Sequence, residues 1–198
     1  MVIQERSART RRCLVLAAAA EIDENGYDRA TLARICNRAH VSMGALTFHF
    51  TSKRELADAV RADARVIVDD RTRQLVSAPG PATASLVRLT VGLVHLLETD
   101  VVVRSAARLA RDCPDDCPDV DGWVGAWLPV VRRLVVEAQC RRELRPEVDP
   151  QVMAALVVHL VAGAEAAVRT GADEAPTEAA VQMERLWAVV LCGAAAWV

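Results

Sequence analysis

The stretch TLARICNRAHVSMGALTFHF, residues 31–50, decides the fold of the first part of the chain. Thr31 and Ser42 are residue types that cap the N-termini of helices, and each precedes a short run suited to a helix. We therefore expect one short helix after Thr31, a turn of three to four residues that contains His40, and a second short helix from Ser42 to about His49. Two short helices at this spacing are typical of a helix-turn-helix, whose second helix enters the major groove of DNA.

Helices are expected on both sides of this motif. Residues 7–25 predict a first helix that ends at Asn25-Gly26, and Thr51 or Ser52 is expected to cap a long helix through about residue 76. After the break SAPGP (77–81), further helices are expected near 82–98, 101–111, 120–142, 150–169 and 177–197. Because no alternating strand pattern of useful length is present, the sequence predicts an all-α protein.

The composition narrows the class of protein. Apolar residues make up 53% of the 198 residues and charged residues 25%, which excludes a disordered or fibrous chain. The sequence shows no apolar leader, so we expect a cytoplasmic protein whose six cysteines are reduced. The apolar run 152–168 is interpreted as a buried helix of a soluble protein, because it is short for a membrane span and carries His159 and Glu165.

The charges are distributed unevenly along the chain. Residues 1–65 hold 11 Arg or Lys against 8 Asp or Glu, whereas the remainder holds 13 against 18. This weak asymmetry favours an anionic partner for the N-terminal part.

The second helix of the motif supplies the predicted DNA contacts. Gly44 and Ala45 stand in its first turn, where small side chains let the backbone approach the base edges. Lys53, at the start of the next helix, suits a phosphate. Three residues are expected to turn inward: Leu46, Phe48 and Phe50. The other positions expected to face DNA, on this helix and on the cap of the helix before it, are Thr31, Ser42, Met43, Thr47 and His49.

Simpler interpretations of single positions stay open. His49 contacts a phosphate or has a structural role; a catalytic role lacks a nucleophile or carboxylate partner in the motif, so no enzyme is expected. Met43 is a groove contact or an exposed hydrophobic residue, and Thr31 serves as a cap with or without a phosphate contact.

The segment RRCLVLAAAAEIDENGYDRATLARICNRAHVSMGALTFHFTSKRELADAV resembles the N-terminal domain of TetR-family transcriptional repressors over about residues 9–60. GALTFHF, VVVRSAARLA and a Trp after the Asp/Pro-rich loop are similar to γ-butyrolactone receptors, which govern antibiotic production in actinobacteria. The resemblance implies a homodimer on a palindromic operator. It also implies a helix-turn-helix DNA-binding domain at 1–52 and a helical ligand-binding and dimerisation domain at 53–198.

The sequence departs from the family pattern at several positions. Thr47 replaces a Tyr that commonly touches a phosphate, and His40 replaces a Gly in the turn, where His tolerates a left-handed conformation better than most residues. Cys36 and Ile22 replace a usual Ala and Phe, and both still fit a core.

The resemblance also implies a ligand pocket. Trp127 matches a Trp that contributes to ligand binding in the receptors, with Trp123 as the alternative in a shifted register, although core packing would explain either ring. Three further residues are expected to line the pocket: Leu89, Leu93 and Val158. The expected ligand is small and mostly apolar, either γ-butyrolactone-like or an antibiotic.

Two positions favour an antibiotic over a γ-butyrolactone as the ligand. The lactone receptors tend to carry Gln and Thr where this chain has Ala64 and Ala164, so a buried lactone would lose hydrogen bonds. A pseudo-receptor, a paralogue that answers to other small molecules, fits this pattern better.

The remaining expectations concern partners and cysteines. The last two helices are apolar nearly all round, which predicts that one side packs on a second copy of the chain. Three interpretations of Cys113 and Cys117 stay open: loop cysteines with no role, a redox pair, or metal ligands. Neither a metal nor a cofactor is expected. A ligand-blind architectural DNA binder and an enzyme using Cys or His chemistry are the rival functions. The sequence supplies neither the operator nor the ligand.

Overall fold

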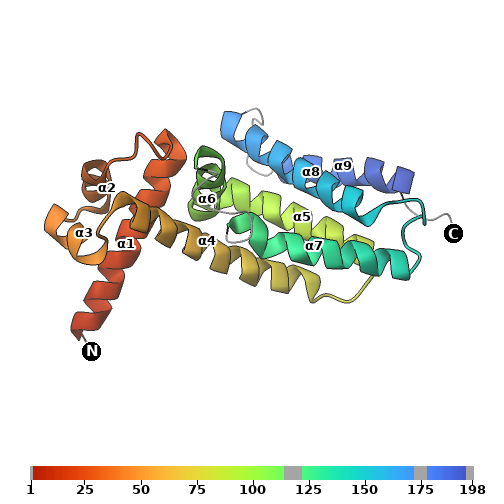
Figure 1. Cartoon of the computed structure of the whole chain (residues 1–198), viewed down its shortest axis with the longest axis horizontal. Helices are drawn as coiled ribbons and strands as arrows, with labels where there is room; N and C mark the ends of the chain where they lie inside the picture. Colours follow the sequence, from red (N-terminus) through yellow and green to blue (C-terminus); the bar gives the residue numbers. More distant parts are fainter. Residues whose placement is uncertain (1, 114–121, 172–177, 195–198) are drawn as a thin grey trace. The chain divides into compact units, whose positions relative to one another are not determined.

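The computed structural model describes residues 2–113, 122–171 and 178–194, with side chains from residue 5 onward. Within these ranges all regular elements are helices (Figure 1), which confirms the all-α prediction. They are α1 (Val2–Asn25), α2 (Leu32–Ala39), α3 (Met43–His49), α4 (Lys53–Val76), α5 (Ala82–Thr99), α6 (Val101–Asp112), α7 (Trp123–Cys140), α8 (Pro150–Thr170) and α9 (Glu178–Ala194).

The helices divide into two compact units. The first unit contains α1, α2, α3, the part of α4 up to Val66, and α6. The second contains α4 from Ile67, α5, α8, α9 and all of α7 after Trp123. This division describes packing, and the functional boundary between residues 52 and 53 stays a prediction.

Short-range hydrogen bonds form the helix-turn-helix as expected. The hydroxyl of Thr31 accepts a hydrogen bond from the backbone N–H of Arg34, and that of Ser42 accepts one from Ala45. Between the two helices His40 adopts a left-handed conformation with φ of 55°, which ends α2. Each hydroxyl accepts a hydrogen bond from a backbone N–H that the helix end leaves without a partner, so the sequence itself determines where α2 and α3 begin.

The core of the first unit fixes the orientation of α3. Leu46 on α3 and Phe50, the residue that ends α3, are both buried. Ile22 and Cys36 are also in the core, as predicted. The expected inward orientation of Phe48 is wrong, because its side chain is 80% exposed. Two residues after Leu46, a helical position has turned about 200° away from the core.

A glycine allows α6 to pack on the end of α1. Gly26 has φ of +80°, and a Cβ at this position would lie 2.8 Å from a guanidinium nitrogen of Arg108 in α6. The backbone N–H of Tyr27 donates to the carboxylate of Asp112 at the end of α6. The positive φ is the reason for a glycine at residue 26, since the tip of the Arg108 side chain is flexible and can move away from a Cβ.

Helix α5 runs through the core of the second unit. Its buried leucines include Leu86 and Leu97, and the indole N–H of Trp187 on α9 donates to the hydroxyl of Thr90 across 2.6 Å. The carboxylate of Glu143 accepts the backbone N–H groups of Ala82 and Thr83, which caps the N-terminus of α5. Side chains far apart in the sequence thus supply the polar contacts that α5 needs.

Helix α8 is less buried than its sequence predicts. By length and composition alone, α8 is long and apolar enough to cross a membrane, with a mean hydropathy of 1.7. Only 22% of its most apolar window is buried, so the expectation of a buried helix is wrong for the single chain. Exposed apolar side chains continue onto α9, where Val189 is 73% exposed. One side of each helix packs inside the unit, and the other carries apolar surface without cover from the described residues.

Candidate nucleic-acid interface and ligand groove

Helix α3 presents a small, uncharged surface. Ser42, Met43, Gly44 and Thr47 are exposed, and Ala45 and His49 are half-buried. The hydroxyl of Thr47 donates to the carbonyl oxygen of Gly44 at 3.1 Å, which leaves its lone pairs available as acceptors. All the positions predicted to face DNA on this helix therefore have at least part of their surface in the solvent.

Gly44 has no packing reason to be a glycine. A Cβ at this position would meet nothing nearer than the hydroxyl oxygen of Ser42 at 3.9 Å, which is ordinary contact. A glycine inside a helix costs about 1 kcal/mol relative to alanine. The packing of the chain therefore gains nothing from a glycine at this position.

Lys53 is engaged within the first unit. Its ammonium donates to the carbonyl oxygens of Tyr27 at 2.7 Å and Asp28 at 3.3 Å, and it lies 4.2 Å from the centroid of the Tyr27 ring. Lys53 thus ties the loop between α1 and α2 to the first turn of α4. Its predicted phosphate contact stays a prediction, and any substitution there also removes these contacts.

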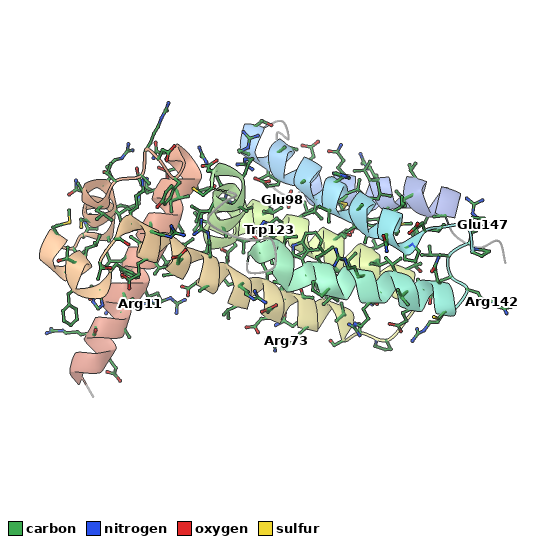
Figure 2. The ribbon with its side chains drawn as sticks, viewed as in Figure 1. Arg11, Arg73, Glu98, Trp123, Arg142 and Glu147 are labelled. Atoms are coloured by element: carbon green, nitrogen blue, oxygen red, sulfur yellow. The ribbon has the colours of Figure 1, made fainter. Side chains whose placement is uncertain are left out.

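Near the end of α3 lies an arginine of α1 that no sequence pattern identifies. The guanidinium of Arg11 lies 5.1 Å from the centroid of the Phe50 ring, and Figure 2 shows it on α1 close to the end of α3. Glu55 accepts the backbone N–H of Thr51, and this hydrogen bond, with one from the Thr51 hydroxyl and the nearby charge of Arg11, lowers the pKa of Glu55. Only the fold brings Arg11 to this site, so a local pattern could not have identified it.

A buried carboxylate fixes α2 on α1. Glu21 is buried, and its two oxygens lie 2.6 Å from Nε of Arg34 and 3.6 Å from Nε of Arg38. Arg38 also bonds Glu24, and that hydrogen bond lowers the pKa of Glu24. These pairs hold the first helix of the motif in place and neutralise two arginines of the first unit.

The family model for bacterial regulatory proteins of the tetR family matches residues 14–60, the segment that holds this helix-turn-helix. The match spans 47 of the 198 residues, so it identifies this segment and not the whole chain. The match covers α2, α3 and parts of α1 and α4. It names a family of regulatory proteins, and the expectation that the chain is not an enzyme stays a prediction.

The proteins to which this chain is similar include receptors. It is 47% identical to the A-factor receptor protein of Streptomyces griseus over 60 residues, which are 30% of this chain and 22% of that receptor's length. Its fold matches the TetR-family protein CprB of S. coelicolor A3(2) with a TM-score of 0.79 and 25% identity, over 96% of this chain and 91% of that one. A γ-butyrolactone receptor described as ArpA-like matches with a TM-score of 0.78 and 23% identity, over 96% and 90%.

The predicted ligand residues lie in two kinds of surroundings. Trp127 is 1% exposed, and Leu89 and Leu93 are completely buried, so these three side chains are part of the packed core. Val158 lines a groove of about 670 Å³ between α7 and α8. Trp123 is buried and lies outside the lining of this groove. The ligand role of all five residues stays a prediction.

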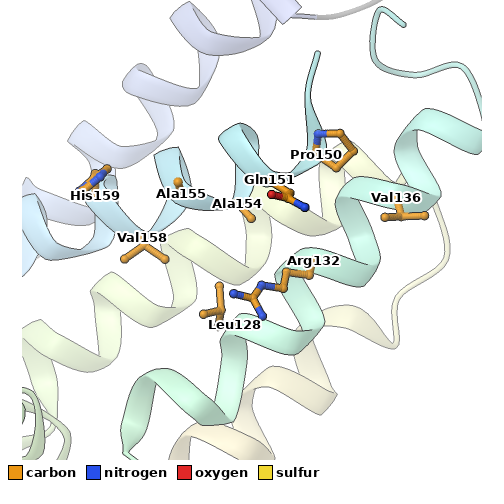
Figure 3. A pocket seen from close by; sticks show the side chains of 9 residues that line it. All are labelled: Leu128, Arg132, Val136, Pro150, Gln151, Ala154, Ala155, Val158 and His159. Atoms are coloured by element: carbon orange, nitrogen blue, oxygen red, sulfur yellow. The ribbon is translucent and has the colours of Figure 1, made fainter. Parts of the chain in front are cut away.

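The groove between α7 and α8 combines an apolar wall with a few polar groups (Figure 3). Arg132 extends along α7 toward Leu128, and Gln151 and His159 come from α8. An apolar cleft with few polar groups is the usual form of a small-molecule site. This groove is therefore the candidate entrance for a ligand among the described residues.

The cysteines form no recognisable metal site in the part of the chain that the structure describes. No three His, Cys, Asp or Glu side chains gather there as a set of metal ligands. Cys36 is buried, and burial raises the pKa of its thiol. Cys13, Cys140 and Cys192 are exposed. Cys117 lies outside the described residues, so the predictions for its pairing with Cys113 stay predictions.

Proposed function

We propose that this protein is a cytoplasmic repressor of the TetR family that binds a palindromic operator as a homodimer and leaves it when a small, mostly apolar ligand binds the second unit. The observation that carries the proposal is the way α3 is anchored on one side and open on the other. Leu46 anchors one face of α3 in the core and Phe50 anchors its C-terminal end, while Gly44 on the opposite face leaves the backbone open to a base edge. A helix anchored and exposed in this way is suited to the major groove.

Exposed apolar residues on α8 and α9 support the dimer. Val152 on α8 and Val181, Leu186 and Val189 on α9 are exposed in the single chain. A second copy related by a two-fold axis would remove this surface from water and present two α3 helices to DNA. Such a dimer reads a palindrome when the two helices are about 34 Å apart, one turn of the duplex.

The proposed ligand class comes from the relatives. Two of them are named as receptors, one for A-factor and one for a γ-butyrolactone, and a further structure with a TM-score of 0.73 concerns the control of antibiotic production by bacterial hormones. Ala64 is completely buried and Ala164 lines a groove between α8 and α9. Neither alanine can bond a lactone carbonyl or hydroxyl, which favours an antibiotic-like ligand over a lactone.

Release from the operator would be a shift between two populations. A ligand moves the equilibrium only by the difference between its affinities for the DNA-binding form and the released form. The groove lined by Val158 is the proposed place where this difference arises.

The test is fluorescence anisotropy with the duplex that lies upstream of this chain's own coding sequence, titrated with lactones and with aromatic antibiotics. A compound that raises the operator Kd supports the proposal. Trp127→Phe tests the ligand role predicted for Trp127, because truncating so buried a ring to alanine would cost about 3–5 kcal/mol of stability. Val158→Trp fills the groove and should block release while leaving operator affinity unchanged. Operator binding that no compound affects would indicate a DNA-binding regulator without a small-molecule ligand.

A further inference from the structure

Phe48 is the most exposed of the large hydrophobic side chains in the described part of the chain, at 80%. The sequence contains two phenylalanines, and the other, Phe50, is 1% exposed. Burying a phenylalanine side chain typically contributes about 1.5–3 kcal/mol, and the fold gains none of this from Phe48. A single exposed hydrophobic residue needs no explanation by itself, so its position on the helix decides what it means.

That position is the face of α3 opposite its anchor. Phe48 lies one turn after Gly44, and both point away from the side on which Leu46 is buried. Gly44 is unfavourable in a helix and Phe48 is unfavourable in water, yet neither is part of the buried core of the chain. Two such residues on one face of a seven-residue helix indicate a contact outside the chain.

The composition of α3 indicates the chemistry of that contact. Its sequence, MGALTFH, contains no Arg, Lys, Asn, Gln, Asp or Glu. These are the side chains that pair with guanine, adenine or cytosine edges through hydrogen bonds, as Arg or Lys does with guanine and Asn or Gln with adenine. The one apolar group that a base pair presents in the major groove is the C5-methyl of thymine, and phenylalanine is among the side chains that contact it.

The Phe48 ring is held in a defined place. It meets the His49 ring edge to face, with the centroids 5.1 Å apart and an interplanar angle of 83°, and His49 is half-buried. A ring supported in this way loses less conformational freedom when it contacts DNA than a free side chain would.

We propose that Phe48 determines part of the operator sequence by packing on the 5-methyl group of a thymine in each half-site. This inference rests on the proposed DNA binding and adds to it the residue and the base. It makes α3 a helix that recognises methyl groups by apolar contact, with Gly44 allowing the approach.

The experiment begins with selection of binding sites from random-sequence duplexes by three full-length proteins: the unaltered chain, Phe48→Ser and Val66→Ala. Val66 is also exposed, at 60%, but it lies on α4 away from the recognition helix and serves as the control. We expect a thymine in each half-site that is enriched by the unaltered chain and by Val66→Ala and is absent from the sites that Phe48→Ser selects. Circular dichroism melting of each variant checks that the fold is intact.

The decisive measurement replaces that thymine by deoxyuridine, which lacks only the methyl group. We expect the Kd of the unaltered chain to rise by about fourfold, the equivalent of returning one methyl-sized group to water. The Kd of Phe48→Ser should not change, and Phe48→Leu should retain part of the preference. Equal losses for the unaltered chain and Phe48→Ser, or indifference of the unaltered chain to every deoxyuridine, would overturn the role of Phe48. Failure of all three proteins to enrich any duplex would instead contradict the proposed function.

Discussion

The side chain of Arg104 donates from Nε to the carboxylate of Asp23 across 2.9 Å, which fixes α6 to the last turn of α1. Arg108, one turn further along α6, donates to the backbone carbonyl of the same aspartate. Both interactions connect residues more than 80 positions apart in the sequence. Helix α6 is therefore part of the unit that contains the helix-turn-helix, although in the sequence it follows α5 of the other unit.

Asp23 and Arg104 should show coupled effects on stability. Their side chains are partly buried, so we expect each alanine variant to lower the free energy of unfolding by about 1 kcal/mol, with a coupling of about 0.5 kcal/mol or more between them. Urea unfolding of the two single variants and the double variant measures the coupling. Strictly additive losses would show that the pair contributes nothing beyond the separate interactions of each residue.

Gly44→Ala should separate stability from function. Because a Cβ at this position meets no close neighbour, the variant should melt at a higher temperature, by the equivalent of up to about 1 kcal/mol. The same methyl group would hold the backbone away from the base edges, so operator affinity should fall about tenfold, the equivalent of one good interaction with a base. Thermal melting and anisotropy on one protein preparation test both effects. A stabilised variant with unchanged affinity would show that no base approaches residue 44.

The sequence predicts interactions between residues that are close together in the chain, and it does not predict those between distant residues. Thr31 and Ser42 were correctly identified as caps, because each bonds an N–H three residues away. The inward orientation expected for Phe48 is wrong, because two residues that are two positions apart on a helix with a period of 3.6 face nearly opposite directions. The contacts of Arg11 and Arg104 depend on the packing of separate helices, and no local pattern contains that information.

The same distinction applies to the candidate sites. The DNA-facing residues of α3 follow from local geometry, since a short capped helix with one anchored face leaves the rest exposed. Whether Trp127 contacts a ligand depends on how the surrounding helices pack against it. The sequence therefore leaves core packing and ligand binding as alternatives for this ring, which the structure shows to be 1% exposed.

Lys53→Ala should affect both DNA binding and stability. If its ammonium contacts a phosphate, affinity for all duplexes should fall, and the slope of log K against log salt concentration should become shallower by about 0.9 for each phosphate that is no longer neutralised. The removal of the hydrogen bonds to the Tyr27 and Asp28 carbonyls should also lower the melting temperature. Anisotropy titrations between 50 and 200 mM salt, about the range over which such slopes are resolved, measure the first effect. A lower melting temperature with an unchanged slope would assign Lys53 to the fold alone.

Glu143→Gln should destabilise the second unit in a pH-dependent way. Burial acts to raise the pKa of Glu143, but hydrogen bonds from the backbone of Thr83 and Ala82 and from the Thr83 hydroxyl outweigh it and lower the pKa. A carboxyl with a lowered pKa in the folded state adds stability above its unfolded pKa, and this stability disappears as the pH falls through the folded value. We expect the variant to be less stable by about 1 kcal/mol at pH 7, as when other helix caps are removed, and the difference to diminish below about pH 4. Glu147→Gln, at an exposed residue without these bonds, is the control in the same urea titrations.

Val189→Glu should convert the proposed dimer into a monomer without unfolding it. Val189 is 73% exposed in the single chain, so a carboxylate there is solvated in the monomer and costs little stability. In a dimer held by α8 and α9 the same carboxylate would be buried without a partner, a cost of several kcal/mol that a dimer of ordinary affinity cannot sustain. Val66→Glu introduces the same charge at an exposed valine of α4 and should leave the dimer intact. Sedimentation velocity gives the mass of each variant, and anisotropy on a palindromic duplex should show weaker binding only for Val189→Glu. If Val189→Glu and Val152→Glu both stay dimeric, the two copies associate through a surface other than α8 and α9.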